Sequence, residues 1–303
     1  MDLNYYLYLL GYANMPDFLI KYLDTPSLIR LKKIGYFCGM DYASKDIYNF
    51  STYISRYMHS LTTALLTYKI SSDRKATLAG LFHDVGTPCF SHVIDYMNKD
   101  YANQESTEEY TERIILSDSY LKQCLLKDGV SANEIIDFKK YSLVDSARPK
   151  LCTDRLDGII LNSLGWTKTI SKQDIKDILN SIAIYINEEG KEEIGFTNYE
   201  VASKVVELSD TIDRYCHSNE DNYMMELLAR LTKYSLDNGY ITYDDLYHYT
   251  EEYLFGLLYS IKDKALEEYL LEFTNKKKED IPITKLPNLK TRVLKPLVNS
   301  RRM

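Results

Sequence analysis

Four side chains of the kinds that bind divalent metal ions stand out in the first half of the sequence. His83 and Asp84 are neighbours, His59 precedes them, and Asp154 follows Asp84 by 70 residues. Two imidazoles and two carboxylates suit a hard-to-borderline divalent ion that keeps open positions for water. Such an ion can lower the pKa of bound water and polarise a phosphoryl oxygen. Asp157 is the alternative to Asp154 as the last ligand.

The residues around these ligands have helical spacing, which would bring the ligands together. Ser51 is placed to cap a helix that carries His59. Asp73 opens a second helix, which is expected to stop at Gly86, just past the His-Asp pair. Further helix signals are the Asp24-Thr25-Pro26 start, the Ser131/Glu134 capping box, and periodic stretches near 107–127, 147–164, 198–216, 221–237, 243–260 and 263–274.

One segment departs from the helical pattern. Isoleucines alternate over residues 182–186, a polar turn follows, and apolar residues return at Ile194 and Phe196. This pattern predicts a small β-hairpin near 182–196. The end of the chain, from 281 to 298, holds three prolines and is expected to be extended.

These features predict an all-α fold, a helical bundle with a small β-hairpin and an additional C-terminal helical region. A boundary near Gly165 would separate a metal-binding catalytic core, residues 1–165, from a helical C-terminal region, residues 166–303. We expect the two parts to share one hydrophobic core.

Composition narrows the class of protein. No stretch of about 18 apolar residues occurs, so no membrane span is predicted. The N-terminus lacks a basic region, and the five cysteines form no C-x-x-C pair, which favours a reduced, cytoplasmic protein.

Charge is uneven along the chain. The net charge is −7, yet residues 276–303 carry nine Lys/Arg and two Asp/Glu. The acidic remainder is a poor generic binder of nucleic acid, which needs clustered Lys/Arg. The basic tail suits a solvated segment or a contact in a homo-oligomer, and a contact with a nucleotide or nucleic acid is the alternative.

Longer motifs in the first 165 residues resemble those of the HD superfamily. The chain reads Thr25-Pro26-Ser27-Leu28-Ile29-Arg30-Leu31, then Arg56-Tyr57-Met58-His59-Ser60-Leu61, then His83-Asp84-Val85-Gly86-Thr87-Pro88-Cys89-Phe90-Ser91-His92. The order and content of these motifs are most similar to the deoxynucleoside triphosphate triphosphohydrolase branch. The resemblance implies the helical HD-domain fold and metal-dependent phosphohydrolase activity.

Carried over position by position, the resemblance implies a role for each matching residue. The metal ligands would be His59, His83, Asp84 and Asp154. Arg56 and Arg155 would face the phosphates, whose oxygens a guanidinium binds in a bidentate manner. The remaining matches are Asp95, a carboxylate near the catalytic centre, and two substrate contacts, Arg30 in the opening motif and Asn162 near the sugar.

The chain also departs from that branch. Thr87 stands where the branch carries a histidine after H-D-x-G, and Glu108 stands where it carries a second one. Gly158 replaces an aromatic contact one turn after the last metal ligand. Glu108 could replace the missing histidine as general acid or base if burial raised its pKa. Alternatively, the Ser106/Glu109 capping box only starts a helix.

The sequence predicts one divalent ion rather than two. Two-metal HD enzymes use additional ligands, usually histidines, and between Asp84 and Asp154 the chain offers only His92. We expect His92 to be structural or to support a ligand. The residue types do not distinguish Mn, Mg, Fe, Co, Ni and Zn.

Three functions are compatible with these observations. The first is hydrolysis of a small-molecule nucleotide, with deoxynucleoside triphosphates as the expected substrates. The second is a nucleoside 5′-monophosphatase or phosphodiesterase on the same fold, which the missing histidines favour. The third is a non-catalytic protein that keeps the metal and senses nucleotides.

Overall fold

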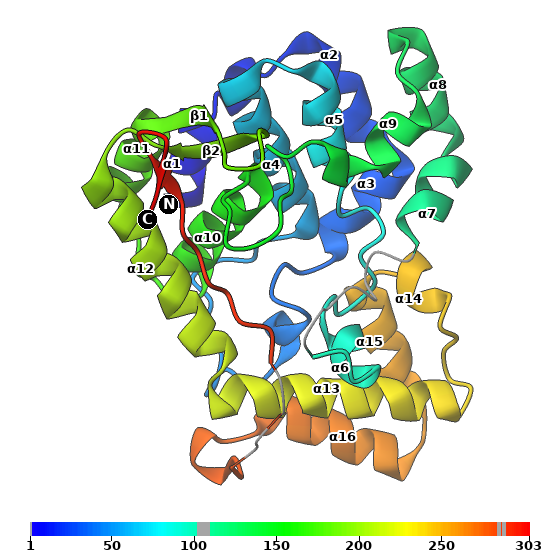
Figure 1. Cartoon of the computed structure of the whole chain (residues 1–303). Helices are drawn as coiled ribbons and strands as arrows, with labels where there is room; N and C mark the ends of the chain where they lie inside the picture. Colours follow the sequence, from blue (N-terminus) through cyan, green and yellow to red (C-terminus); the bar gives the residue numbers. More distant parts are fainter. Residues whose placement is uncertain (1, 102–109, 284–285, 287–288) are drawn as a thin grey trace.

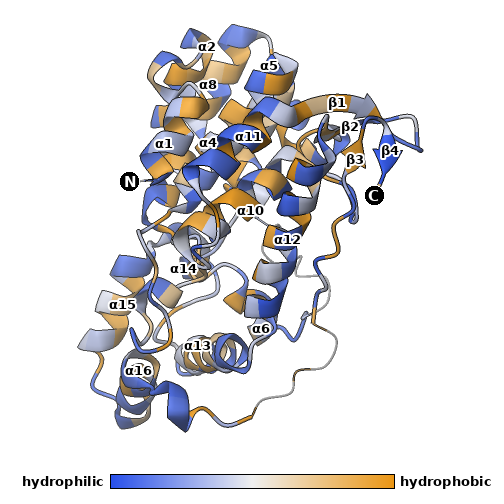
Figure 2. Cartoon of the chain, turned by 90° about the vertical axis from the view of Figure 1, so that its left-hand side faces the viewer, coloured by the Kyte–Doolittle hydropathy of each residue, from blue (hydrophilic) through white to orange (hydrophobic). Residues whose placement is uncertain are grey.

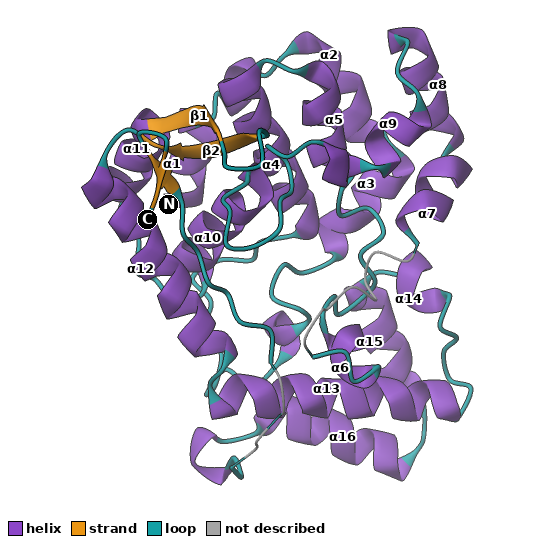
Figure 3. Ribbon diagram, in the orientation of Figure 1, coloured by secondary structure: helices purple, strands orange, loops and turns teal. Residues whose placement is uncertain are grey.

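Helices dominate the computed structural model, which describes residues 2–101, 110–283, 286 and 289–303 (Figure 3). Within those residues there are sixteen α-helices and one small four-stranded sheet, which confirms the predicted all-α class. The helices are α1 (Asp2–Leu9), α2 (Asp17–Ile20), α3 (Pro26–Arg30), α4 (Arg56–Ser71), α5 (Arg74–Phe82), α6 (Val93–Met97), α7 (Thr111–Ser117), α8 (Ser119–Asp128), α9 (Ala132–Ile136), α10 (Thr153–Gly165), α11 (Lys172–Ser181), α12 (Tyr199–Cys216), α13 (Asn219–Asp237), α14 (Asp245–His248), α15 (Glu251–Ser260) and α16 (Lys264–Asn275).

Three of these helices carry or flank the predicted metal ligands. Helix α4 packs against both α5 and α10 (Figure 1). The loop that begins after α5 carries His83 and Asp84. Helix α12 leads from this group to α13, which packs against α6 and α16. The ligands therefore lie on elements that are joined by a common core.

The first of these helices begins later than the sequence predicted. Ser55, not Ser51, caps α4, and its hydroxyl accepts a hydrogen bond from the Met58 amide at 3.2 Å. The residues before the cap are extended because a bridge joins Gly35 and Ser55, with the Arg56 amide donating to Ile34 O at 2.9 Å. The bridge to Gly35 keeps the backbone before Arg56 extended, although Ser51 is a residue type that favours a helix start.

Other helix predictions are confirmed with altered ends. Asp73 caps α5, but the helix ends at Phe82, and residues 83–86 form turns instead of a fourth helical turn. The predicted 107–127 helix is divided into α7 and α8 at Asp118, whose carboxylate caps α8 and also binds Ser27. Ser131 and Glu134 form the predicted capping box of α9.

The predicted hairpin is present and belongs to a larger sheet. Strands β1 (Ile182–Ile186) and β2 (Glu192–Phe196) pair antiparallel, as expected. The C-terminal strand β3 (Leu297–Val298) adds to β2 in parallel, and β4 (Arg301–Arg302) pairs with β3. The end of the chain is thus attached to the hairpin instead of remaining only an extended tail.

Buried apolar residues from Tyr6 to Leu294 form one contiguous cluster. Surface helices contribute one face to it. Figure 2 shows that much of the visible face of α11 is hydrophilic, whereas Ile175, Ile178 and Leu179 are buried. The division of the chain near Gly165 stays a prediction.

Gly86 offers a test of how the loop after α5 is packed. A Cβ atom there would lie 2.3 Å from Thr111 Oγ1 and 2.7 Å from its amide nitrogen, at the start of α7. Gly86→Ala must displace backbone, so we expect it to lower the free energy of unfolding by about 1–3 kcal/mol in urea denaturation. Gly256→Ala is the control, because nothing lies within 4 Å and the residue is inside α15, where alanine is favoured over glycine by up to about 1 kcal/mol. Equal stability of both variants would contradict the close contact.

Candidate metal centre

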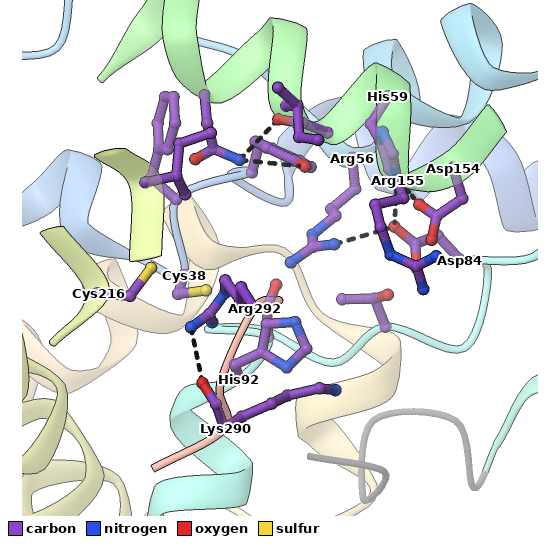
Figure 4. A pocket seen from close by; sticks show the side chains of 18 of the residues that line it. Cys38, Arg56, His59, Asp84, His92, Asp154, Arg155, Cys216, Lys290 and Arg292 are labelled. Atoms are coloured by element: carbon purple, nitrogen blue, oxygen red, sulfur yellow. Dashed lines mark hydrogen bonds and ion pairs between the residues drawn. The ribbon is translucent and has the colours of Figure 1, made fainter. Parts of the chain in front are cut away.

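The four predicted metal ligands converge from three elements. His59 lies on α4, His83 and Asp84 follow α5, and Asp154 is in the first turn of α10. His59 Nε2 and His83 Nε2 lie 2.9 and 3.5 Å from the same oxygen, Asp154 Oδ1. Asp84 oxygens lie 3.9 and 3.7 Å from those two nitrogens (Figure 4). His59, His83 and Asp154 offer ligand atoms that all lie within 4.8 Å of one another.

Both imidazoles are held in the tautomer that a metal requires. His59 Nδ1 lies 2.8 Å from Asp157 Oδ2, and His83 Nδ1 lies 2.7 Å from Gly80 O. A carboxylate and a carbonyl accept hydrogen bonds, so each Nδ1 carries a proton and each Nε2 faces the site, where its lone pair would bind a metal that displaces the second proton. His83 Nε2 is buried and has no hydrogen-bond partner in the described part of the chain. The donor set therefore fits a divalent cation.

Asp157 supports His59 from behind instead of facing the centre. Its carboxylate is fully buried and accepts hydrogen bonds from Tyr6 Oη at 2.6 Å and Thr62 Oγ1 at 2.8 Å, in addition to His59. These three donors occupy both oxygens, whereas Asp154 Oδ1 faces both Nε2 atoms. The geometry favours Asp154 over Asp157 as the last ligand.

The electrostatics of the site call for positive charge between the ligands. Burial acts to lower the pKa of His59, but hydrogen bonds with Asp154 and Asp157 outweigh it and raise that pKa to about 10. Burial acts to raise the pKa of Asp154, but the two histidines hold it well below the usual range. Without a metal, protons on the imidazoles therefore balance the carboxylates, and a cation would take over that charge.

The structure brings three of the predicted substrate and phosphate residues to one cavity. Its volume is about 720 Å³, and Arg56, Arg155 and Asn162 line it beside the ligands. Arg56 Nη1 pairs with Asp84 Oδ2 at 3.0 Å. Arg155 donates to the carbonyls of Ser146, at 2.7 Å, and of Lys150. Asn162 Nδ2 donates to Gly158 O at 2.8 Å in its own helix.

Two other predicted residues, Arg30 and Asp95, are not among the described residues that line this cavity. Arg30 donates to the carbonyls of Thr87 and Tyr249, so it holds the segment after the His-Asp pair. Asp95 is fully buried, and its Oδ2 lies 2.8 Å from His92 Nδ1. Glu108 lies outside the described residues.

Several cavity residues were given no place in the cavity by the sequence. His92 lines the cavity, although we expected a structural or supporting role. Its position in the motif, three residues before Asp95, was the available signal. The other additions are cations from separate loops and from the basic tail, for which no spacing pattern exists: Lys139, Arg148, Lys290 and Arg292.

In the described residues, no helix combines the length and apolar character needed to cross a bilayer. Comparison with known proteins gives two relatives. One is the uncharacterized protein YdhJ of Bacillus subtilis, 27% identical over 217 residues, which are 70% of this chain and 64% of YdhJ. The other is the metal-dependent phosphohydrolase cns2 of Cordyceps militaris, 25% identical over 133 residues, which are 44% of this chain and 37% of cns2. The chain thus spans less than two thirds of the length of either relative.

The same comparison matches residues 56–148 to a protein family. That segment includes Arg56 and three of the four candidate ligands, and Asp154 follows six residues after its end. The matched family is described as the HD domain, and the segment that matches it begins at the first residue of α4.

Proposed function

We propose that the protein is a metal-dependent phosphohydrolase that acts on nucleotides, with deoxynucleoside triphosphates as the first substrates to test. The observation that carries this proposal is a set of two histidines and two aspartates on the wall of a cavity that is also lined by six Lys/Arg side chains. When bound there, one divalent ion would activate water and polarise a phosphoryl oxygen. The HD domain match and the relative cns2 support the same class of reaction.

The lining of the cavity suits the two parts of a nucleotide. Cations are the usual partners of phosphate oxygens, and guanidinium groups bind them in a bidentate manner. Aromatic side chains also line the cavity and offer faces on which a base can stack. They include Tyr36, Phe37, Tyr48, Phe50 and Trp166.

The chain's own residues divide the work in this proposal. Arg56 and Arg155 bind phosphate oxygens and stabilise charge that develops in the transition state. His92, oriented by the buried Asp95, moves a proton to or from the reacting oxygens, because one ring nitrogen is held by the carboxylate and the ring lies on the cavity wall. Asp95 then acts through His92. Glu108 stays the alternative acid.

Product analysis tests this function. Purified protein is incubated with deoxynucleoside and ribonucleoside triphosphates, nucleoside monophosphates and a phosphodiester, each with Mn²⁺, Mg²⁺, Co²⁺ or Fe²⁺. We expect tripolyphosphate and a nucleoside from a triphosphate. Orthophosphate from a monophosphate, or cleavage of the diester alone, would instead support the second function. Tight nucleotide binding without any product would support the non-catalytic sensor.

Metal binding depends on Asp157 if His59 is oriented as described. Asp157→Asn removes the charge that holds Nδ1–H, so we expect the affinity for Mn²⁺ to fall roughly 10- to 100-fold in calorimetric titration. His83→Ala should abolish binding, because it removes a ligand. Tyr6→Phe is the matched control, since it removes one donor to the same carboxylate and leaves His59 bound. Wild-type affinity in Asp157→Asn would show that the carboxylate does not orient the ligand.

Proton transfer can be assigned by comparing two variants. If His92 transfers the proton, His92→Gln should lower kcat by roughly two to four decades and leave the metal content unchanged. Glu108→Gln is measured in parallel. A large loss in Glu108→Gln, with near-normal kcat in His92→Gln, would transfer the role to Glu108.

A further inference from the structure

The C-terminal segment crosses the cavity that holds the metal site. In Figure 1 it rises from the region of α13, passes along α12 and ends at the sheet. Leu289, Lys290 and Arg292 of this segment line the same cavity as Arg56 and Arg155. They lie about 140 residues beyond the end of the HD domain match at residue 148.

Hydrogen bonds from the backbone hold the segment along this path. The Lys290 amide donates to Tyr101 O at 3.0 Å, and the Arg292 amide donates to Asp213 Oδ1 at 2.9 Å. Farther on, the Lys295 amide donates to Pro149 O at 2.9 Å. Because the three acceptors belong to distant parts of the chain, these hydrogen bonds fix the backbone positions of Lys290 and Arg292.

The segment is also anchored at its end. Strand β3 pairs with β2, and the Arg302 guanidinium pairs with Glu193, whose side chain is fully buried. Arg302 also pairs with Glu188 at 2.6 Å. A buried carboxylate without its partner is costly, so this ion pair disfavours detachment of the strand. The cavity-lining residues are held between two fixed points.

Guanidinium groups from the region of α10 and from the tail line the same cavity. Arg148 and Arg155 come from the loop before α10 and from α10 itself, and Arg292 comes from the tail. Burial, and then the nearness of Arg155 and Arg292, lower the pKa of Arg148 to about 10. Among the carboxylates near these guanidinium groups, Asp145 lies 4.0 Å from Arg155 and Asp213 lies 3.8 Å from Arg292, both longer than a hydrogen bond, and the buried Asp221 lines the same cavity. An anion bound among the guanidinium groups would accept charge-assisted hydrogen bonds that these long ion pairs do not supply.

We propose that Lys290 and Arg292 bind the phosphates of the substrate that lie farther from the metal site. This inference rests on the proposed function and narrows it to substrates with a chain of two or more phosphates. Arg56, paired with Asp84 beside the ligands, is placed for the reacting phosphate. Figure 4 shows Lys290 and Arg292 on a different part of the pocket from Arg56 and the candidate ligands, so we assign to them the phosphates that do not react.

A purely structural role for Arg292 is the competing explanation. Its Nη1 donates to Lys290 O at 3.3 Å and lies 3.8 Å from Asp213 Oδ1, both long for a guanidinium that serves only to hold the fold. The two explanations predict different effects when Arg292 is replaced by a neutral residue. A structural arginine affects stability and all ligands alike, whereas a phosphate-binding arginine affects polyphosphate binding selectively.

The test measures binding of inorganic tripolyphosphate and of inorganic phosphate, each with Mg²⁺ in excess, by calorimetry. Lys290→Gln and Arg292→Gln should each weaken tripolyphosphate binding about tenfold, the size of one charge-assisted hydrogen bond. Phosphate binding should change little. Arg292→Lys should restore part of the affinity. Arg301→Gln is the matched control, because it removes one charge from an exposed residue of the same tail that is not on the described cavity wall.

The outcomes separate this inference from the proposed function. Tail-dependent binding of tripolyphosphate, in a protein that hydrolyses no nucleotide, would support the inference and overturn the activity. Equal tripolyphosphate affinity in the wild type and in the Lys290→Gln/Arg292→Gln double variant would overturn the inference, even if hydrolysis is observed. Equal losses for phosphate and tripolyphosphate, with a lowered Tm, would assign Arg292 to structure. If the glutamine variant does not fold, Arg292→Lys decides, since loss of stability without loss of binding contradicts the inference.

Discussion

The buried carboxylate of Asp157 is the interaction on which the rest of the site depends. A charge removed from water is costly unless donors surround it, and here Tyr6, Thr62 and His59 supply them from α1 and α4. The carboxylate itself comes from α10, so one group joins three helices. The same contact sets the tautomer of His59. The orientation of the candidate ligand His59 is therefore coupled to the packing of these three helices.

The segment after the His-Asp pair is held by a second set of buried polar contacts. Arg30 binds the Thr87 carbonyl, and Glu251 accepts hydrogen bonds from the amides of Phe90, at 3.1 Å, and Gly35, at 2.9 Å. Burial raises the pKa of Glu251 to about 8 despite these amides. An arginine that the sequence placed on the substrate is thus used to position the segment that leads to His92. Arg30 and Glu251, which are not among the described residues of the cavity wall, thus hold the segment that carries Thr87 and His92, which are.

The four candidate metal ligands could be singled out from the sequence because each lies in a local pattern. His83 and Asp84 are adjacent, and His59 and Asp154 lie on helices whose apolar periodicity is readable. Local patterns could not predict where α4 begins or which groups the Arg30 guanidinium binds. Both are decided by partners far away in the chain, Gly35 for the bridge at Ser55 and Tyr249 for the guanidinium. No spacing rule reports those contacts.

The C-terminal tail shows the same limit on a larger scale. Its charge and prolines indicated a basic, extended segment, and a nucleotide contact was one of the alternatives. Its place beside β2 rests on a parallel pairing of Gly195 and Phe196 with Leu297 and Val298, two residues long and about a hundred residues apart. A strand that short has no signature of its own, and its register is fixed by the buried Glu193 and Arg302 pair. Three of the four candidate metal ligands therefore lie in the segment that matches the HD domain, and Asp154 follows it closely, whereas Lys290 and Arg292 reach the cavity only because the tail pairs with the hairpin.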